Sequence, residues 1–187
     1  MKVTESGLKG LLLIEADCYG DQRGFFMETW HRERYAQFGI REDFVQDNLS
    51  YSEHGVLRGL HFQNPQGQGK LVYVIKGEVY DVAVDIRKGS PTFGQWEGYY
   101  LSDENRRQLY IPPGFAHGFC VTGESALFAY KCTDFYNRET ERGLLWNDPD
   151  IGIKWPFENP LLSEKDLVLP RLNDIEKETL PDYNFIL

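Results

Sequence analysis

Six polar side chains that could act on an anionic ligand lie on or beside expected β-strands: Arg58, His61, Lys70, His117, Tyr130 and Lys131. The first two belong to the stretch VLRGLHFQ at residues 56–63, which would hold aliphatic side chains if it only filled a core. Because a buried charge without a partner is costly, several cations in one domain interior indicate a negatively charged ligand. The imidazole and phenol groups add the ability to take and give protons.

The spacing of Arg58 and His61 sets a geometric condition on this site. The two positions differ by an odd number, so a regular strand would turn their side chains to opposite faces. Gly59 lies between them and can host a β-bulge that redirects one of them.

The elements that must position these residues are short apolar runs, each closed by turn residues. Lys76-Gly77 stands between LVYVI and EVYDVAVDI and predicts a tight hairpin. In the second of these strands an alternation of period two predicts one face on a core and one polar face. The core face is Tyr80, Val82, Val84 and Ile86, and the polar face is Val79, Asp81, Ala83 and Asp85.

Only residues 31–39 and the tail at 174–180 have a helical pattern, and both are short. About ten strands without long intervening helices exclude a parallel α/β sheet. The sequence predicts an all-β fold, an antiparallel sandwich or jelly roll with a few short peripheral helices. No internal repeat or low-complexity linker is visible, so we expect a single domain over residues 1–187.

The composition and the N-terminal sequence predict which classes of partner and which cellular compartment to expect. The formal net charge of −9 repels a phosphate backbone, so nucleic-acid binding is not expected. The three cysteines, Cys18, Cys120 and Cys132, are odd in number and far apart, which favours a reducing compartment. The N-terminus does not read as a signal peptide and no segment is long enough to span a bilayer, so the sequence predicts a cytoplasmic protein without a membrane partner.

Two motifs resemble the metal-binding motifs of cupins. The spacing from Gly55 to His61 fits the first motif, but Gln63 replaces its second histidine and no glutamate follows within reach. The second motif, Pro-x-Gly-x-x-His, ends at His117. Two histidines without a carboxylate or a third imidazole make a poor site for a transition metal, so we expect no metal and no other cofactor.

Several long motifs, in order, resemble the dTDP-4-dehydrorhamnose 3,5-epimerase family. They are FVQDNLSYSEHGVLRGLHFQ, QGKLVYVIKGEVYDVAVDIRKGSPTFGQW, LSDENRRQLYIPPGFAHGF, AYKCTDFY, LLWNDPDIGIKWP and LSEKD, and the likeness extends over about residues 20–166. The resemblance implies a metal-free, cupin-like antiparallel jelly roll and a homodimer. It also implies an isomerase that inverts carbons 3 and 5 of dTDP-4-keto-6-deoxyglucose through enolates, giving dTDP-4-dehydrorhamnose in dTDP-rhamnose biosynthesis.

The resemblance also implies a role for each polar residue. His61 would be the base, Asp166 would orient its ring, Tyr130 would be the acid on the opposite face, and Lys70 would stabilise the enolate oxygen. Arg58 would bind the diphosphate, because its planar fork matches two oxygens at once. The nucleotide side would be lined by Arg23, Glu28, Gln46, Asp47 and Asn48, and further substrate contacts would come from His117, Glu141 and Lys165. Phe135 stands where many members have tyrosine, and phenylalanine has no hydroxyl to offer the substrate there.

Three alternatives remain. A single-centre epimerase acting on a related 4-keto sugar nucleotide would use the same base and acid. A catalytically silent module that binds a sugar nucleotide would keep Arg58 and lose His61 or Tyr130, whereas both are present. A metal-dependent cupin isomerase or dioxygenase is disfavoured by Gln63.

Overall fold

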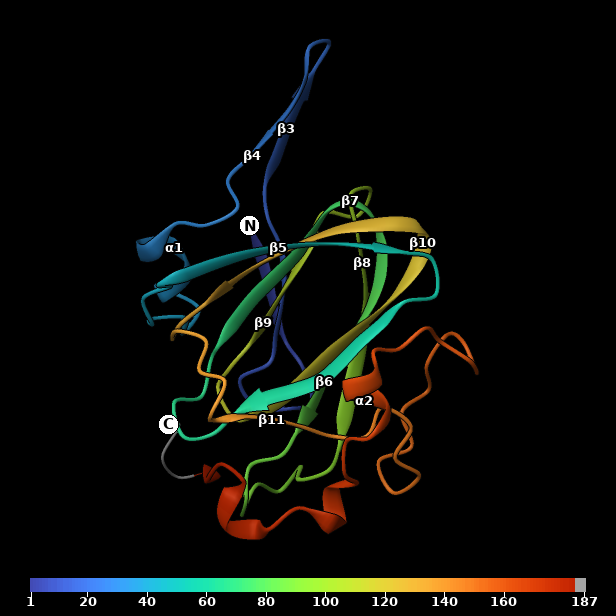
Figure 1. Ribbon diagram of the computed structural model, residues 1–187. Helices are drawn as coiled ribbons and strands as arrows, with labels where there is room; N and C mark the ends of the chain where they lie inside the picture. Colours follow the sequence, from blue (N-terminus) through green and yellow to red (C-terminus); the bar gives the residue numbers. More distant parts are fainter. Residues whose placement is uncertain (184–187) are drawn as a thin grey trace.

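Two layers of antiparallel β-sheet share two long strands in the computed structural model, which describes residues 1–183 (Figure 1). The shared strands are β7 (Lys70–Asp85) and β10 (Phe115–Cys132). The first half of β7 and the second half of β10 join β5 (Gln46–Glu53), β9 (Arg107–Ile111), β2 (Leu12–Glu15) and β1 (Lys2–Glu5). The other halves join β6 (Leu57–Gln63), β8 (Trp96–Ser102) and β11 (Glu141–Gly143). The predicted antiparallel jelly roll is confirmed.

The main core lies between these two layers. Phe119 from one layer and Phe128 from the other stack with their ring centroids 4.2 Å apart, which shows that the layers face each other. Val72 and Ala83, from opposite halves of β7, are fully buried in the same cluster. Aromatic and β-branched side chains suit this packing because they pack well on a pleated surface.

The prediction of a hairpin at Lys76-Gly77 is wrong. β7 continues through both residues and passes there from one layer to the other. Gly77 has a φ of +87°, and a Cβ at this position would stand 1.9 Å from the carbonyl oxygen of Ser125 on β10. The glycine is therefore needed for a close approach of two bent strands rather than for a turn.

The prediction of a polar, solvent-facing side of β7 is also wrong, because both faces of the second half of this strand are buried. Asp81 is fully buried on the inner side, where Val79 and Ala83 belong to the main core. The outer side packs against segments from the C-terminal part of the chain in a second apolar cluster, which includes Val82, Val84, Ile86, Leu144, Ile151, Leu172 and Leu180. The predicted alternation of side chains along β7 is correct. Which face is exposed to solvent cannot be predicted from β7 alone, because it depends on the C-terminal segments that pack against it.

The helices are few and short, as expected. The pattern at 31–39 is α1 (Arg32–Ala36), whereas the tail forms two 3₁₀ turns, η1 (Leu172–Asp174) and η2 (Lys177–Thr179), in place of an α-helix. A second helix, α2 (Glu164–Leu167), was not expected; the Ser163 hydroxyl caps it by accepting the backbone N–H of Asp166. No helix within residues 1–183 is both long and apolar enough to cross a membrane.

A two-stranded hairpin, β3 (Cys18–Asp21) and β4 (Gly24–Met27), projects from the body of the molecule (Figure 1). Its aromatic side chains Tyr19, Phe25 and Phe26 are between 60% and 69% exposed. The guanidinium of Arg106 lies 4.3 Å from the Phe25 ring centroid. An isolated hairpin is at best marginally stable in water, and exposed apolar patches of this kind often mark interaction sites.

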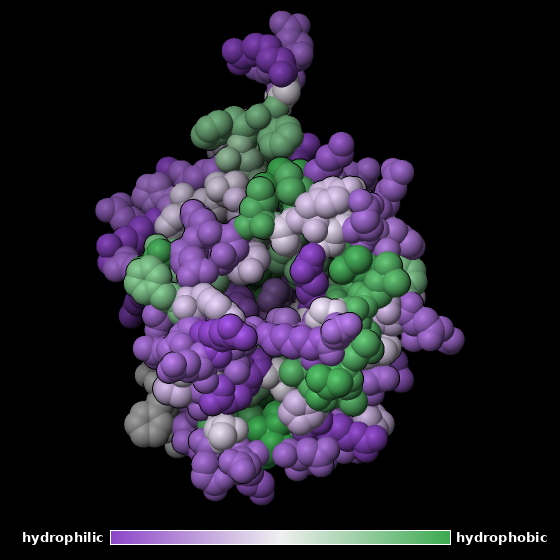
Figure 2. All heavy atoms as spheres, in the orientation of Figure 1, coloured by the Kyte–Doolittle hydropathy of each residue, from purple (hydrophilic) through white to green (hydrophobic). Residues whose placement is uncertain are grey.

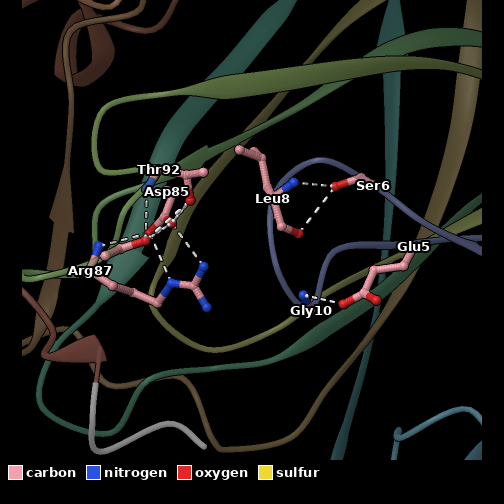
Figure 3. Close-up of polar contacts among 8 residues, drawn as sticks. Glu5, Ser6, Leu8, Gly10, Asp85, Arg87 and Thr92 are labelled. Atoms are coloured by element: carbon pink, nitrogen blue, oxygen red, sulfur yellow. Dashed lines mark hydrogen bonds and ion pairs between the residues drawn. The ribbon is translucent and has the colours of Figure 1, made fainter.

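The loops beyond the ends of the strands are held by polar contacts of their own (Figure 3). The buried Asp85 accepts two 2.8 Å hydrogen bonds from the Arg87 guanidinium and one of 2.6 Å from the Thr92 hydroxyl. Burial opposes the charge of Asp85, but these donors outweigh it and lower the pKa of the carboxyl. In the N-terminal loop, the Ser6 hydroxyl accepts the backbone N–H of Leu8 at 2.9 Å.

Candidate active site

A cavity of about 480 Å³ lies between the two layers. Figure 2 shows this face of the molecule hollowed near its centre, with hydrophilic residues around much of the hollow and a hydrophobic band on one side. The cavity is lined by seven of the predicted site residues: Arg58, His61, Lys70, His117, Tyr130, Lys165 and Asp166. A smaller recess of about 260 Å³ shares His61, Lys70 and Tyr130 and adds three more, Gln46, Asn48 and Glu141.

The shortest polar contact among the residues that line the cavity joins His61 on β6 to Asp166 on α2. Nε2 of His61 donates to Oδ1 of Asp166 at 2.6 Å, so the free lone pair of the ring is on Nδ1. The Asp166 side chain is only 5% exposed. Burial opposes its ionised form, but the hydrogen bond and charge of His61, with the Ser163 hydroxyl and the Gly59 N–H, hold its pKa below the usual range. Asp166 is therefore an anion that can stabilise a protonated His61.

The β-bulge that Gly59 was expected to permit is present. His61 and Arg58 are three steps apart on β6, whereas their partners on β10, His117 and Phe119, are only two steps apart. The extra residue allows both side chains to line the same cavity. Gly59 has a φ of +118°, and a Cβ there would stand 2.5 Å from Cα of Gly118. No other residue fits at this position without moving β6 away from β10.

Tyr130 and Lys70 reach the cavity from the other layer. Tyr130 pairs with Asn48 of β5 and Val72 of β7, whereas His61 pairs with His117 in the opposite layer. Burial is the main reason that the pKa of the Tyr130 phenol is raised, so the group keeps its proton at neutral pH.

Lys70 places its amine at the wall of the cavity. Within residues 1–183 it forms no ion pair. Burial lowers the pKa of its ammonium, and the nearby Cys132, Asp81 and Glu141 act in the opposite direction. A developing negative charge on a ligand would relieve the cost of holding this ammonium inside the protein.

A second histidine–carboxylate pair lies deeper in the layer that contains β6 and β8. Nε2 of His117 is 2.9 and 3.0 Å from the two carboxylate oxygens of Asp81, and both residues are buried. Burial raises the pKa of Asp81, although His117 and Lys70 oppose this shift. Sequence reasoning missed Asp81 because the alternation placed it on a solvent face.

Arg58 is held at the cavity by neutral groups only. Its Nε donates to the Ser52 hydroxyl at 2.9 Å, and Nη2 is 3.5 Å from the Tyr51 carbonyl oxygen. The guanidinium forms no ion pair with any residue of the described chain. It therefore keeps its charge and most of its donors for an anionic ligand.

The smaller recess contains a residue that the sequence did not single out, Tyr136. Its hydroxyl donates to Glu141 at 2.9 Å, and its backbone N–H donates to the Gln46 side chain, also at 2.9 Å. Lys165 forms a 2.7 Å ion pair with the same carboxylate, Glu141. Phe135, where a tyrosine was expected, is 64% exposed and does not line the recess. The neighbouring Tyr136 supplies a hydroxyl at this end of the site instead.

Three predicted site residues line neither the cavity nor the smaller recess. Asp47 faces the outside of β5 and pairs with Lys131 at 2.9 Å. Arg23 is at the tip of the projecting hairpin, where it pairs with Asp21, and Glu28 pairs with Arg34 at 2.9 Å. A single copy of the chain does not bring these residues to the cavity.

The residues at the cupin metal positions are engaged in other contacts. His61 and His117 each bind one carboxylate, and within residues 1–183 no three His, Cys, Asp or Glu side chains gather where they could hold a metal ion. The buried Gln63 donates to the carbonyl oxygens of Gln66 and Phe135. It holds the loops at the rim of the site together.

Comparisons with known proteins agree with this geometry. The sequence model of the dTDP-4-dehydrorhamnose 3,5-epimerase family matches residues 5–174. A dTDP-4-dehydrorhamnose 3,5-epimerase of Shigella flexneri is 54% identical over 169 residues, which are 89% of this chain and 93% of that protein. A dTDP-4-dehydrorhamnose 3-epimerase of Streptomyces niveus is 41% identical, over 89% of this chain and 81% of its own.

The likeness extends to solved structures. The dTDP-6-deoxy-D-glucose-3,5-epimerase of Legionella pneumophila, in complex with dTDP-4-keto-L-rhamnose, superposes with a TM-score of 0.95 at 54% identity, covering 97% of this chain and 98% of that one. The fold, the family model and the extent of the identity agree, and the chain belongs to the dTDP-4-dehydrorhamnose 3,5-epimerase family.

Proposed function

We propose that the protein inverts carbons 3 and 5 of dTDP-4-keto-6-deoxyglucose, giving dTDP-4-dehydrorhamnose, in dTDP-rhamnose biosynthesis. The observation that carries this proposal is that a histidine–aspartate pair and a protonated phenol line one cavity from two opposing layers, with an unpaired ammonium beside them. Epimerisation next to a ketone needs a base, an acid on the other face and a stabilised enolate oxygen.

In the proposed reaction, Nδ1 of His61 removes the proton from carbon 3 or carbon 5. The electron pair of the broken C–H bond moves to the carbon 4 oxygen, where the charge of Lys70 stabilises the enolate. Tyr130 then delivers a proton to the opposite face of the same carbon, and the ketone reforms. Asp166 stabilises the imidazolium between the two steps. All the groups are side chains of this protein, so the proposal involves no cofactor.

The test is to incubate the protein with dTDP-4-keto-6-deoxyglucose in deuterated water and to read the label by magnetic resonance. Deuterium at both carbon 3 and carbon 5, with both centres inverted, is expected. Label and inversion at carbon 3 alone would assign a single-centre epimerase, and no exchange at either carbon would overturn the proposal.

For Arg58 we propose contact with the diphosphate, and we expect Arg58→Ala to weaken substrate binding more than it slows the chemical step. The diphosphate does not react, so its contact with Arg58 is present both before and during the transition state. Steady-state kinetics should show a raised KM with a smaller change in kcat. Arg58→Lys, which keeps the charge but not the fork, should fall between the two proteins. A loss confined to kcat would contradict this role.

A homodimer is part of the proposal and is supported by two separate surfaces. One is the projecting hairpin with its exposed aromatic residues. The other is the outer face of β5 and β7, where Leu49, Tyr51 and Ile75 are 60%, 58% and 48% exposed. In a dimer the hairpin would carry Arg23 to the cavity of the partner, which accounts for a predicted site residue that is remote from its own cavity.

A complementation experiment tests this arrangement. We expect a mass in solution of twice the 21.7 kDa of one chain, measured by light scattering. Arg23→Ala and His61→Asn should each be impaired, and refolding the two together should restore activity, since the mixed dimer has one cavity with both residues intact. Absence of recovery in verified mixed dimers would show that Arg23 does not serve the partner's cavity.

A further inference from the structure

One polar group inside the cavity is not used by the proposed mechanism. Ser50 on β5 lines the cavity, and its hydroxyl is buried without a hydrogen-bond partner in residues 1–183. Buried polar groups are nearly always paired, because leaving one unpaired forfeits its hydrogen bond to water without replacement. A hydroxyl in this position on the wall of a binding cavity indicates that the partner is a ligand.

The place of Ser50 on its strand shows which part of a ligand it would meet. Alternate residues of β5 face inward, and Asn48, Ser50 and Ser52 follow one another on this face. Asn48 pairs with Tyr130, and the Ser52 hydroxyl holds Arg58 at 2.9 Å. Successive residues on one face are about 6.6 Å apart, so Ser50 stands between the phenol and the Arg58 site.

The surroundings of Ser50 favour an acceptor with negative charge. Arg58 and Lys70, which form no ion pair within residues 1–183, line the same cavity and attract an anion. A hydroxyl can donate to such an oxygen without adding another charge to the interior. The Ser50 hydroxyl forms no hydrogen bond in the described chain, so a rotation about χ1 that turns it toward the ligand breaks none.

We propose that Ser50 is a substrate-binding residue whose hydroxyl donates a hydrogen bond to the phosphate attached to the sugar. This inference rests on the proposed function, because it takes the ligand to be a nucleoside diphosphate sugar. In such a ligand the sugar-linked phosphate lies between the reacting ring at Tyr130 and the rest of the diphosphate at Arg58. Ser50 then holds the phosphate that connects the nucleotide, which binds without reacting, to the sugar ring, which reacts.

The experiment compares two ligands that differ by this phosphate. Calorimetry on Ser50→Ala should give an affinity for dTDP about tenfold weaker than that of the unaltered protein, as expected for one hydrogen bond to a charged group. The affinity for dTMP, which lacks the second phosphate, should not change. Ser50→Cys, which keeps the shape but donates weakly, should lie between the two. Ser125→Ala, the same change at a β10 residue that does not line the cavity, should bind both ligands normally.

Unchanged dTDP binding in Ser50→Ala would overturn the proposal, and so would an equal loss for dTDP and dTMP. Turnover of the 4-keto sugar by the unaltered protein separates this test from that of the proposed function. A protein that is active but insensitive to Ser50→Ala loses only the present inference. A protein that binds dTDP through Ser50 without turning over the sugar loses the proposed reaction and keeps the phosphate contact.

Discussion

Replacing His61 by asparagine should abolish both proton exchange and inversion. Asparagine can still donate to Asp166, but it has no basic nitrogen for the hydrogen on carbon 3 or carbon 5, so no enolate forms. Loss of a general base typically lowers the rate by about 10²–10⁴-fold, equivalent to about 3–5 kcal/mol of barrier. The measurement is deuterium uptake and inversion, read separately by magnetic resonance on the recovered sugar nucleotide.

The matched control is His54→Asn. Nδ1 of His54 donates one hydrogen bond to the Gly123 carbonyl oxygen, and His54 does not line the cavity, so its loss should leave both rates unchanged. Affinity for dTDP should be close to normal in His61→Asn, which would show that the nucleotide site is intact. Free exchange in His61→Asn would remove His61 from the role of base.

Replacing Tyr130 by phenylalanine should separate exchange from inversion. His61 can still form the enolate and return a solvent-derived deuteron to the face from which the proton came. Label then enters while configuration is retained, and inversion falls by about 10²–10⁴-fold. The raised pKa of the Tyr130 phenol supports this role, since an acid must hold its proton until the enolate is present.

Tyr100→Phe serves as the control, because Tyr100 on β8 is 47% exposed and does not line the cavity. The two active-site variants are informative as a pair. Should Tyr130→Phe stop exchange while His61→Asn permits it, the roles of base and acid are reversed. Equal loss of exchange and inversion in Tyr130→Phe would mean that the phenol takes part in enolate formation as well.

Local sequence was sufficient wherever a residue's effect depends on its immediate neighbours. The bulge at Gly59 followed from the odd spacing of Arg58 and His61 and from the freedom of glycine, and the structure contains it. The alternation along β7 was also correct. Such features are set by backbone geometry within a few residues, which a single sequence contains.

Features that depend on distant segments could not be predicted in this way. Lys76-Gly77 fits a hairpin and a bend in a long strand equally well, and only the pairing with β10 decides between them. Asp81 was assigned to solvent because nothing near it indicates that the C-terminal segments cover the other face. Ser50 and Tyr136 have no sequence signal of their own. They became visible as site residues only once β5 and the 134–137 loop were placed at the cavity.

The bond between His61 and Asp166 joins residues that are 105 positions apart, and this separation has a consequence for synthesis. At about 5–20 residues per second, a ribosome needs about 5–20 s to make the segment between them. Over that interval β6 has been made while α2 is still missing, and until residue 132 has been added its partner β10 is also absent or incomplete. An unpaired strand edge is prone to mispairing, and folds dominated by contacts between distant residues form slowly. Nascent chains of this enzyme should therefore depend on chaperones for longer than those of a helical protein of the same length. Fragments that end before residue 166 should remain inert.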